Sequence, residues 1–153
     1  MDKKNIEKKV THTYILSIRE ASAEALLEGS KPHEFRKRFD NYKNYARVFL
    51  YVTRPVKKIV GQVIFDAPIH AEVNELYKLL ENNKFDDELS LSKYFSRYAK
   101  AYALPVIEAK RFNDPINLKY LKNRFPSFNP PMSYSKIDDP SLRELKVFLS
   151  ASP

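Results

Sequence analysis

Three apolar runs of strand character lie in the first half of the chain, and only one helical segment lies among them. The runs span residues 14–18, 46–53 and 58–69 and are rich in β-branched and aromatic residues, as strands are. The sequence RPVK between the second and third runs predicts a turn, so these two strands should pair antiparallel. A doubly wound parallel sheet needs a helix after each strand and is therefore disfavoured. We expect a mixed α+β fold with a small, strongly bent sheet or barrel and peripheral helices.

The remaining segments predict helices and shorter strands around this sheet. Residues 20–28 predict a helix that ends at Gly29 in a left-handed C-cap. The alternating pattern at 33–39 predicts a strand, and 101–109 predict another, in which Pro105 should lie at an edge or a bulge. We also expect helices at 71–83 and 91–99, a short helix capped by Asn117 and a last helix from Pro140.

The composition argues against several functional classes. The chain has 153 residues, no cysteine, three histidines and two glycines. These counts argue against a disulfide scaffold, a thiolate or local zinc site and a glycine-rich phosphate loop. No apolar run approaches the ~20 residues that span a bilayer, and the N-terminus lacks the apolar segment of a signal peptide. We therefore expect a cytoplasmic protein with no cofactor, no metal and no membrane association.

The positive charge is concentrated in one short segment. Residues 31–58 contain nine basic and two acidic residues, whereas the other 125 residues contain 18 basic and 17 acidic ones. A focused positive field attracts polyanions such as nucleic acid. A solvated basic face that keeps the protein soluble explains the same pattern equally well.

The residues most able to carry chemistry form a G-x-K-x-x-E-x-R pattern at the predicted helix-to-strand junction. Lys31 should lie in a tight turn, and Glu34 and Arg36 should project from one face of the following strand. An ammonium, a carboxylate and a guanidinium that converge on one pocket can bind phosphate and polarise a carbonyl. A turn followed by an exposed strand with ordinary ion pairs is the simpler interpretation.

Other candidates for nucleic-acid binding follow this motif. The segment RFDNYKNYAR interleaves aromatic and basic residues, an arrangement that can stack bases while the cations meet phosphates. Tyrosines that cover one end of a barrel are the alternative interpretation. The candidates in this segment are Arg38, Tyr42, Tyr45 and Arg47, and those around the next predicted turn are Thr53, Arg54, Lys57 and Lys58.

The motif, preceded by YILSI and a short helix, resembles the ASCH domain, a branch of the PUA-like superfamily. The block TRPVKKIVG is similar to the second half of that family's core, and SKYF, AYALPV and FNPP are similar to its usual ending. The resemblance is close at 14–64 and looser to residue 131. It implies a PUA-like small β-barrel with peripheral helices over 14–131, a basic N-terminal extension at 1–13 and a C-terminal extension with a short helix at 132–153.

The resemblance also implies a function, because PUA-like domains commonly bind RNA or modified bases. We predict an RNA- or nucleotide-binding protein in which Lys31 and Arg36 contact phosphate or a base carbonyl. Glu34 would accept hydrogen bonds from a base edge or a ribose hydroxyl, and it would also orient Arg36.

Two alternatives stay open. An enzyme of the same fold, either an amidohydrolase on a modified nucleoside such as acetylated cytidine or a ribonuclease, would use Lys31 and Glu34 as catalytic residues. In the amidohydrolase branch of the family a lysine acts with a threonine and a glutamate; here Glu34 occupies the threonine position, and Asp87 or Glu88 is the nearest counterpart of the glutamate. A protein-interaction module would instead dock a protein partner on the helix at 140–149. The sequence leaves the oligomeric state unknown.

Overall fold

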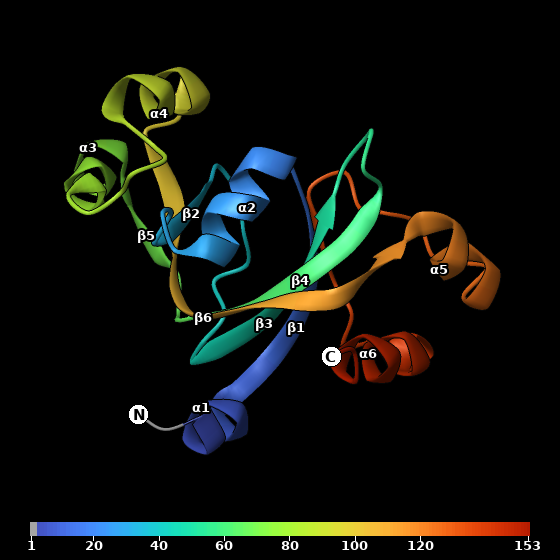
Figure 1. Ribbon diagram of the computed structural model, residues 1–153. Helices are drawn as coiled ribbons and strands as arrows, with labels where there is room; N and C mark the ends of the chain where they lie inside the picture. Colours follow the sequence, from blue (N-terminus) through green and yellow to red (C-terminus); the bar gives the residue numbers. More distant parts are fainter. Residues whose placement is uncertain (1–2) are drawn as a thin grey trace.

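A strongly curled sheet forms the centre of the computed structural model, which describes residues 3–153 (Figure 1). The first two residues of the predicted N-terminal extension lie outside the described residues. Over the described residues the sheet has seven strands: six follow the order β2-β6-β4-β3-β1-β7, and the seventh, β5, pairs with β6. β1 runs parallel to β3, and every other pair is antiparallel. The strands are β1 (Val10–Ile18), β2 (His33–Arg36), β3 (Tyr45–Val52), β4 (Lys58–Phe65), β5 (Ile69–Glu72), β6 (Lys100–Asn117) and β7 (Tyr134–Lys136).

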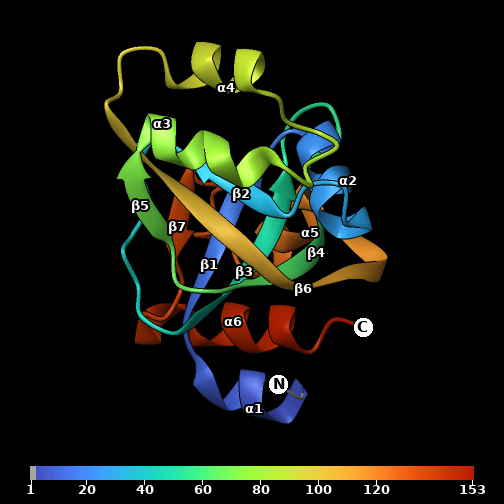
Figure 2. The same ribbon diagram turned by 90° about the vertical axis from the view of Figure 1, so that its left-hand side faces the viewer.

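The two faces of the sheet bury different side chains, because successive residues of a strand point to opposite sides. On one face Leu16 packs in a cluster with Leu26 of α2, and on the other Ile15 packs in a cluster with Leu149 of α6. Figure 2 shows α3 and α4 at one end of the sheet and α6 with α1 at the other. The α-helices are α1 (Lys3–Lys9), α2 (Glu20–Glu28), α3 (Val73–Leu76), α4 (Glu88–Phe95), α5 (Leu118–Arg124) and α6 (Arg143–Ser150), and the 3-10 helices are η1 (Tyr77–Leu80) and η2 (Pro140–Leu142).

The mixed α+β class and the central elements predicted from the sequence are confirmed. β3 and β4 pair antiparallel across the predicted turn. α2 ends at Gly29, whose φ of 92° is the left-handed conformation of a C-cap. Pro105 lies in β6 beside a shift in the β4–β6 register, where Ile64 pairs with Glu108 and Phe65 with Val106. The bulge expected at this proline is therefore present.

Several segments differ from their predictions, among them β6, which extends well past the strand expected at 101–109. The helix expected at 71–83 is replaced by the end of β5, α3 and η1, because Ala71 pairs with Ala101 of β6. These ladder hydrogen bonds outweigh a helical pattern whose preference is weak by itself. β1 begins at Val10, four residues earlier than expected, because Val10 pairs with Tyr45 of β3. The strand expected at 33–39 ends at Arg36.

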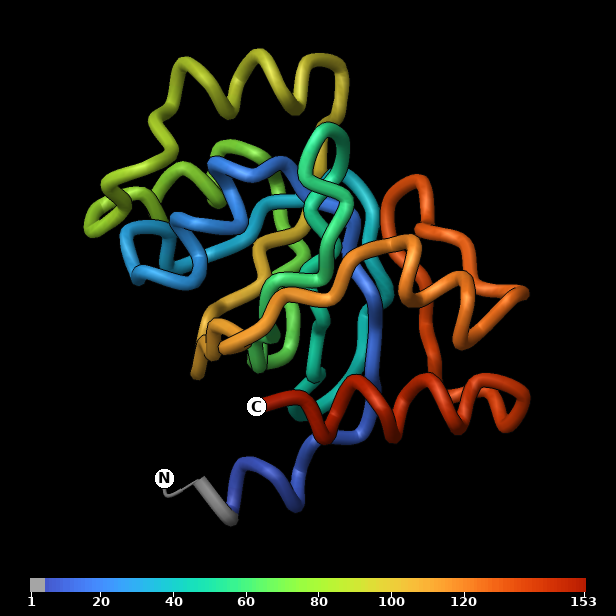
Figure 3. Tube along the Cα trace, turned by 45° about the vertical axis from the view of Figure 1, so that its right-hand side comes forward, coloured from blue at the N-terminus to red at the C-terminus, as the bar shows by residue number. Residues whose placement is uncertain are grey.

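The C-terminal residues complete the sheet and its second core. β7 pairs with β1, and Ile137 and Leu145 are buried in the same cluster as Phe49. Figure 3 shows the last helix crossing beside strands of the N-terminal half. The domain boundaries at residues 13 and 131 stay a prediction. No helix within residues 3–153 is both long and apolar enough to cross a membrane.

Candidate functional site

The junction between α2 and β2 positions the G-x-K-x-x-E-x-R motif. The left-handed conformation of Gly29 turns the chain, and the Lys31 backbone N–H donates to the carbonyl oxygen of Ala25 at 3.1 Å. β2 then begins at His33 and antiparallel pairing with β6 holds it extended. This local geometry places Lys31 at the start of the strand, with the side chains of Glu34 and Arg36 on one face.

Glu34 bridges the two cations of the motif. Its Oε1 lies 3.2 Å from Lys31 Nζ, and its Oε2 accepts a hydrogen bond of 2.9 Å from Arg36 Nε. Lys31 and Glu34 are 4% and 3% exposed, so both charges are largely withdrawn from water. Arg36 also donates from Nη2 to the Ser17 carbonyl oxygen at 3.0 Å and from Nη1 to Ser133 Oγ at 3.4 Å. The guanidinium is therefore held in a fixed orientation.

A second carboxylate reaches Lys31 from a distant loop. Asp86 Oδ2 lies 3.1 Å from Lys31 Nζ, and Asn83 Nδ2 donates to the same oxygen at 3.1 Å. The sequence predicts Asp87 or Glu88 as the nearest counterpart of a distal glutamate, but the carboxylate that reaches Lys31 is that of Asp86. Asp87 is exposed and caps α4 by accepting from the Ser90 backbone N–H, so its carboxylate serves the helix end. No local pattern in the sequence marks Asp86, because its contact is made across the fold.

These groups lie in a cleft of about 620 Å³ between α2, β2 and the segment at 85–94. Two partly exposed aromatic rings line it: Phe85 is 40% and Tyr94 is 39% exposed. Lys31 Nζ lies 5.0 Å from the centre of the Phe85 ring, within the range of a cation–π contact. Burial raises the pKa of Tyr94, so its hydroxyl is a neutral donor at physiological pH. The cleft is also lined by Ser17, Arg19, Thr53 and Met132.

Most of the other sequence candidates do not line the cleft. Tyr42 is 5% exposed within the core, and its hydroxyl donates to the Asp66 carbonyl oxygen at 2.7 Å. A buried ring cannot stack on a base, so the prediction for Tyr42 is corrected. Arg47 forms an ion pair with Glu7 of α1, which occupies its guanidinium. Tyr45 is half-buried beside Arg47 at the start of β3.

The basic candidates near the β3–β4 turn are exposed. Thr53 is half-buried and lines the cleft. Arg54, Lys57 and Lys58 are exposed and lie outside it, as does Arg38 on the segment after β2. The structure therefore brings together the motif and Thr53, and it leaves the other predicted cations on the surface.

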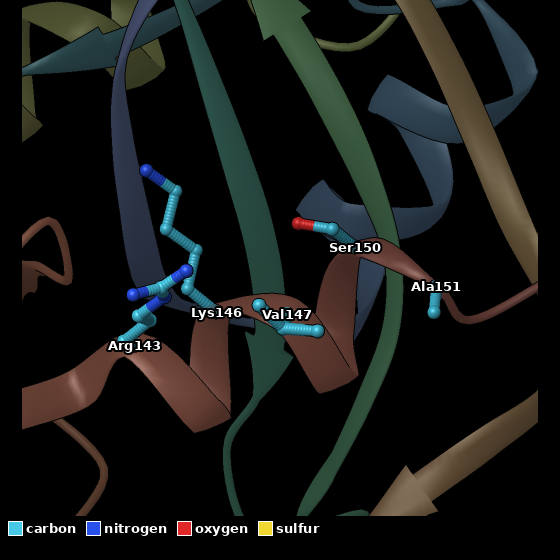
Figure 4. Close-up of a pocket in the computed structure, with 5 residues that line it drawn as sticks. All are labelled: Arg143, Lys146, Val147, Ser150 and Ala151. Atoms are coloured by element: carbon cyan, nitrogen blue, oxygen red, sulfur yellow. The ribbon is translucent and has the colours of Figure 1, made fainter.

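A second hollow, of about 460 Å³, lies along α6 (Figure 4). It contains none of the candidate residues. The apolar side of α6 packs on the protein itself, because Leu145 and Leu149 belong to the second core cluster. Docking of a partner on this helix stays a prediction. The hollow is lined by Arg143, Lys146, Val147, Ser150 and Ala151.

Comparison with known proteins gives related proteins of similar sequence and fold. No protein-family model matches the chain. Over 119 residues it is 33% identical to a Zymomonas mobilis protein named ASCH domain-containing ribonuclease, a match that covers 78% of this chain and 80% of that protein.

Solved structures extend this similarity to the fold. The crystal structure of ASCH from Zymomonas mobilis is similar with a TM-score of 0.80 at 29% identity, covering 93% of this chain and 96% of that one. Human THYN1 protein, solved in complex with DNA containing 5-methylcytosine, is similar with a TM-score of 0.53 at 13% identity, over 94% of this chain and 99% of that one. At that identity the likeness concerns the fold alone.

Proposed function

This chain belongs to the ASCH domain family, and from that premise we propose that it binds RNA in the cleft around Lys31, Glu34 and Arg36. The observation that carries the proposal is the presence in one cleft of cations suited to phosphate and aromatic rings suited to bases. RNA-binding surfaces combine these two features because unstacked bases need an aromatic partner and the backbone needs positive charge. Such a role agrees with the cytoplasmic location expected from the sequence.

Each lining group has a distinct part in this proposal. Arg19 is exposed at the start of α2 and forms no ion pair among residues 3–153, so it is available to a phosphate. Arg36 is preorganised by Glu34 and can add a charge-assisted hydrogen bond. Phe85 and Tyr94 offer ring faces to a base. Glu34 and Asp86 balance much of the cationic charge, so we expect moderate affinity for phosphate and selectivity from hydrogen bonds.

A second candidate function is RNA cleavage, which the name of the Zymomonas mobilis relative favours. In this proposal the ribose 2′-oxygen attacks the adjacent phosphorus and the bond from phosphorus to the 5′-oxygen breaks, leaving a 2′,3′-cyclic phosphate. Glu34 would accept the 2′-hydroxyl proton, and Lys31 would supply a proton to the leaving 5′-oxygen. Arg36 would stabilise the charge that develops on the phosphorus oxygens.

The amidohydrolase alternative is supported only in part. In its favour, the carboxylate of Asp86 lies beside Lys31. The position expected to hold a threonine is still Glu34, which is occupied by two ion pairs. Amide hydrolysis through Lys31 would need that ammonium to lose its proton while two carboxylates stabilise its charge. We therefore rank this chemistry below RNA binding and RNA cleavage.

Fluorescence anisotropy with a labelled single-stranded RNA tests the binding proposal. We expect Arg19→Ala to weaken binding by about tenfold, since a lost charge-assisted hydrogen bond costs roughly 1.5 kcal/mol. Arg143→Ala removes the same charge from α6, outside the cleft, and should leave affinity unchanged apart from a small general effect of net charge. Absence of RNA binding in the wild-type protein, or equal losses in both variants, would contradict the proposal.

Substitution of Lys31 distinguishes a binder from an enzyme. In a binder, Lys31→Arg should retain most of the affinity, because the charge is kept. In an enzyme that uses proton transfer by Lys31, the same change should abolish turnover as fully as Lys31→Ala, since arginine does not release its proton near neutral pH. Glu34→Gln should likewise reduce turnover far more than affinity. Cleavage of the labelled RNA and acetate release from acetylated cytidine are followed separately, with circular dichroism to show that each variant is folded.

A further inference from the structure

Two stretches of the chain contain basic residues and no acidic residue. Residues 41–65 hold five lysines and arginines, and residues 115–137 hold four, with no aspartate or glutamate in either. The first stretch spans the β3–β4 hairpin, and the second begins at the end of β6 and includes α5. The second stretch does not stand out when charges are summed over the whole chain outside residues 31–58, because acidic residues before and after it bring that net charge close to zero.

The fold places these two stretches side by side. The Leu118 backbone N–H donates to the Lys57 carbonyl oxygen at 2.9 Å, and Lys58 pairs with Asn117 in the β4–β6 ladder. Figure 1 shows α5 directly after the end of β6, on the side of the sheet where β4 begins. α5 therefore continues the basic surface of the hairpin.

The basic side chains of this region are available to a ligand. Five of them are exposed and form no ion pair within residues 3–153: Arg54, Lys57 and Lys58 at the tip of the hairpin, and Lys119 and Lys122 of α5. Lys119 and Lys122 are three residues apart and so share one side of the helix. Tyr120 lies between them in sequence and is 48% exposed. The region thus combines unpaired cations with one accessible aromatic ring.

We propose that Arg54, Lys57, Lys58, Lys119 and Lys122 form a second RNA-binding surface, which holds the backbone of a single strand that leaves the cleft. This hairpin–α5 surface begins next to the cleft, since Thr53 lines the cleft and Arg54 is the next residue. The inference rests on the proposed function, to which it adds a longer single-stranded ligand. It implies that affinity grows with RNA length beyond the segment that fills the cleft.

Single-stranded RNA fits this surface better than other polyanions do. The exposed Tyr120 ring among lysines is typical of surfaces on which unpaired bases stack while cations follow the backbone. A membrane surface would need several apolar side chains that insert between lipids. Apart from Tyr120, the large exposed apolar residues of the described chain lie outside residues 53–58 and α5. We therefore treat anionic membranes as an outcome of the test.

The test compares a trinucleotide with a single-stranded RNA of about 12 nucleotides, a length within the range that such surfaces cover. The variant Lys119→Ala/Lys122→Ala removes two charges from α5. The matched control, Lys78→Ala/Lys100→Ala, removes two exposed charges from η1 and the start of β6, outside the hairpin–α5 surface and the cleft. Anisotropy is measured for all three proteins across a salt series, and vesicles of phosphatidylcholine with phosphatidylglycerol serve as a separate arm.

We expect the α5 variant to lose about tenfold in affinity for the long RNA at low salt and about 1.4 in the salt slope, as for two phosphate contacts to a single strand. Its affinity for the trinucleotide should match that of the wild type, and the control should behave as wild type with both RNAs. Equal affinity of the α5 variant and the control for the long RNA would overturn the hairpin–α5 surface while leaving the proposed function intact. Failure of the wild type to bind either RNA would refute both. Loss of vesicle binding without loss of RNA binding would assign the surface to membranes instead.

Discussion

The carboxylate of Asp86 lies 3.1 Å from the Nζ of Lys31, across 55 residues of chain. The loop before α4, which contains Asp86, makes a second contact with the α2–β2 junction: the Lys84 backbone N–H donates to the Ser30 carbonyl oxygen at 2.9 Å. These two contacts fix the loop against the α2–β2 junction. They also place Phe85 over the Lys31 ammonium, so that one wall of the cleft depends on an ion pair at its base.

Replacement of Asp86 should therefore lower stability and loosen this wall. We expect Asp86→Ala to reduce the free energy of unfolding by about 1–3 kcal/mol, because a nearly buried ammonium loses one of its two carboxylate partners. Glu88→Ala, at an exposed position two residues later, should change it by less than about 0.5 kcal/mol. Urea unfolding followed by circular dichroism measures both. Equal stability of the two variants would show that Asp86 contributes nothing to the fold.

The two tyrosines Tyr42 and Tyr94 should respond to substitution in opposite ways. Tyr42→Phe removes the buried hydrogen bond to the Asp66 carbonyl oxygen, so it should cost about 1 kcal/mol of stability and leave RNA affinity unchanged. Tyr94→Ala removes a ring from the cleft and should weaken RNA binding by about 1–3 kcal/mol. Tyr94→Phe keeps the ring and should retain affinity. Urea unfolding and RNA anisotropy separate the two effects, and a loss of affinity in Tyr42→Phe would contradict this assignment.

His33 should make the stability fall as the pH is lowered. Burial lowers the pKa of His33 below its ordinary value of 6.5, and its Nδ1 has no hydrogen-bond partner among the described residues. The unfolded chain therefore binds a proton more readily than the folded protein does. This contribution to stability is complete above pH 6.5 and is lost as the pH falls through the lower folded pKa. The melting temperature should drop more steeply between pH 7.5 and about pH 5 in the wild type than in His33→Gln; parallel profiles would rule the effect out.

Gly61 should tolerate no side chain, because β4 and β6 approach closely there. A Cβ at this position would lie 2.4 Å from the Lys110 carbonyl oxygen and 3.1 Å from the Arg111 Cα, both backbone atoms. We expect Gly61→Ala to destabilise the protein by about 1–3 kcal/mol or more, since strands must move apart to admit the methyl group. Gly29→Ala meets no atom within 4 Å and should cost only about 1–2 kcal/mol, from the left-handed backbone. Thermal melts compare the two, and a larger loss at Gly29 would contradict the close approach at Gly61.

Local chemistry made much of the fold and the centre of the site predictable. A high content of β-branched and aromatic residues identified β3 and β4, because such side chains pack well in a sheet. Gly29 marked the end of α2, because glycine adopts a left-handed backbone without strain. Lys31, Glu34 and Arg36 could be placed together because they lie within six residues, on one turn and one short strand. The helix predicted at 71–83 was wrong, because pairing of Ala71 with β6 decided the structure of this segment.

What the sequence by itself determined is the central strands, the helix α2 and the local cluster of Lys31, Glu34 and Arg36, because these depend on backbone preferences and on neighbours within a few residues. Only the tertiary structure decided that Asp86 joins this cluster, that Tyr42 is buried, and that Lys119 and Lys122 extend the basic surface of the hairpin. Each of these outcomes depends on the register and packing of segments far apart in the chain. Such contacts leave no periodic pattern in the sequence, because their free energy arises only when the whole sheet has formed.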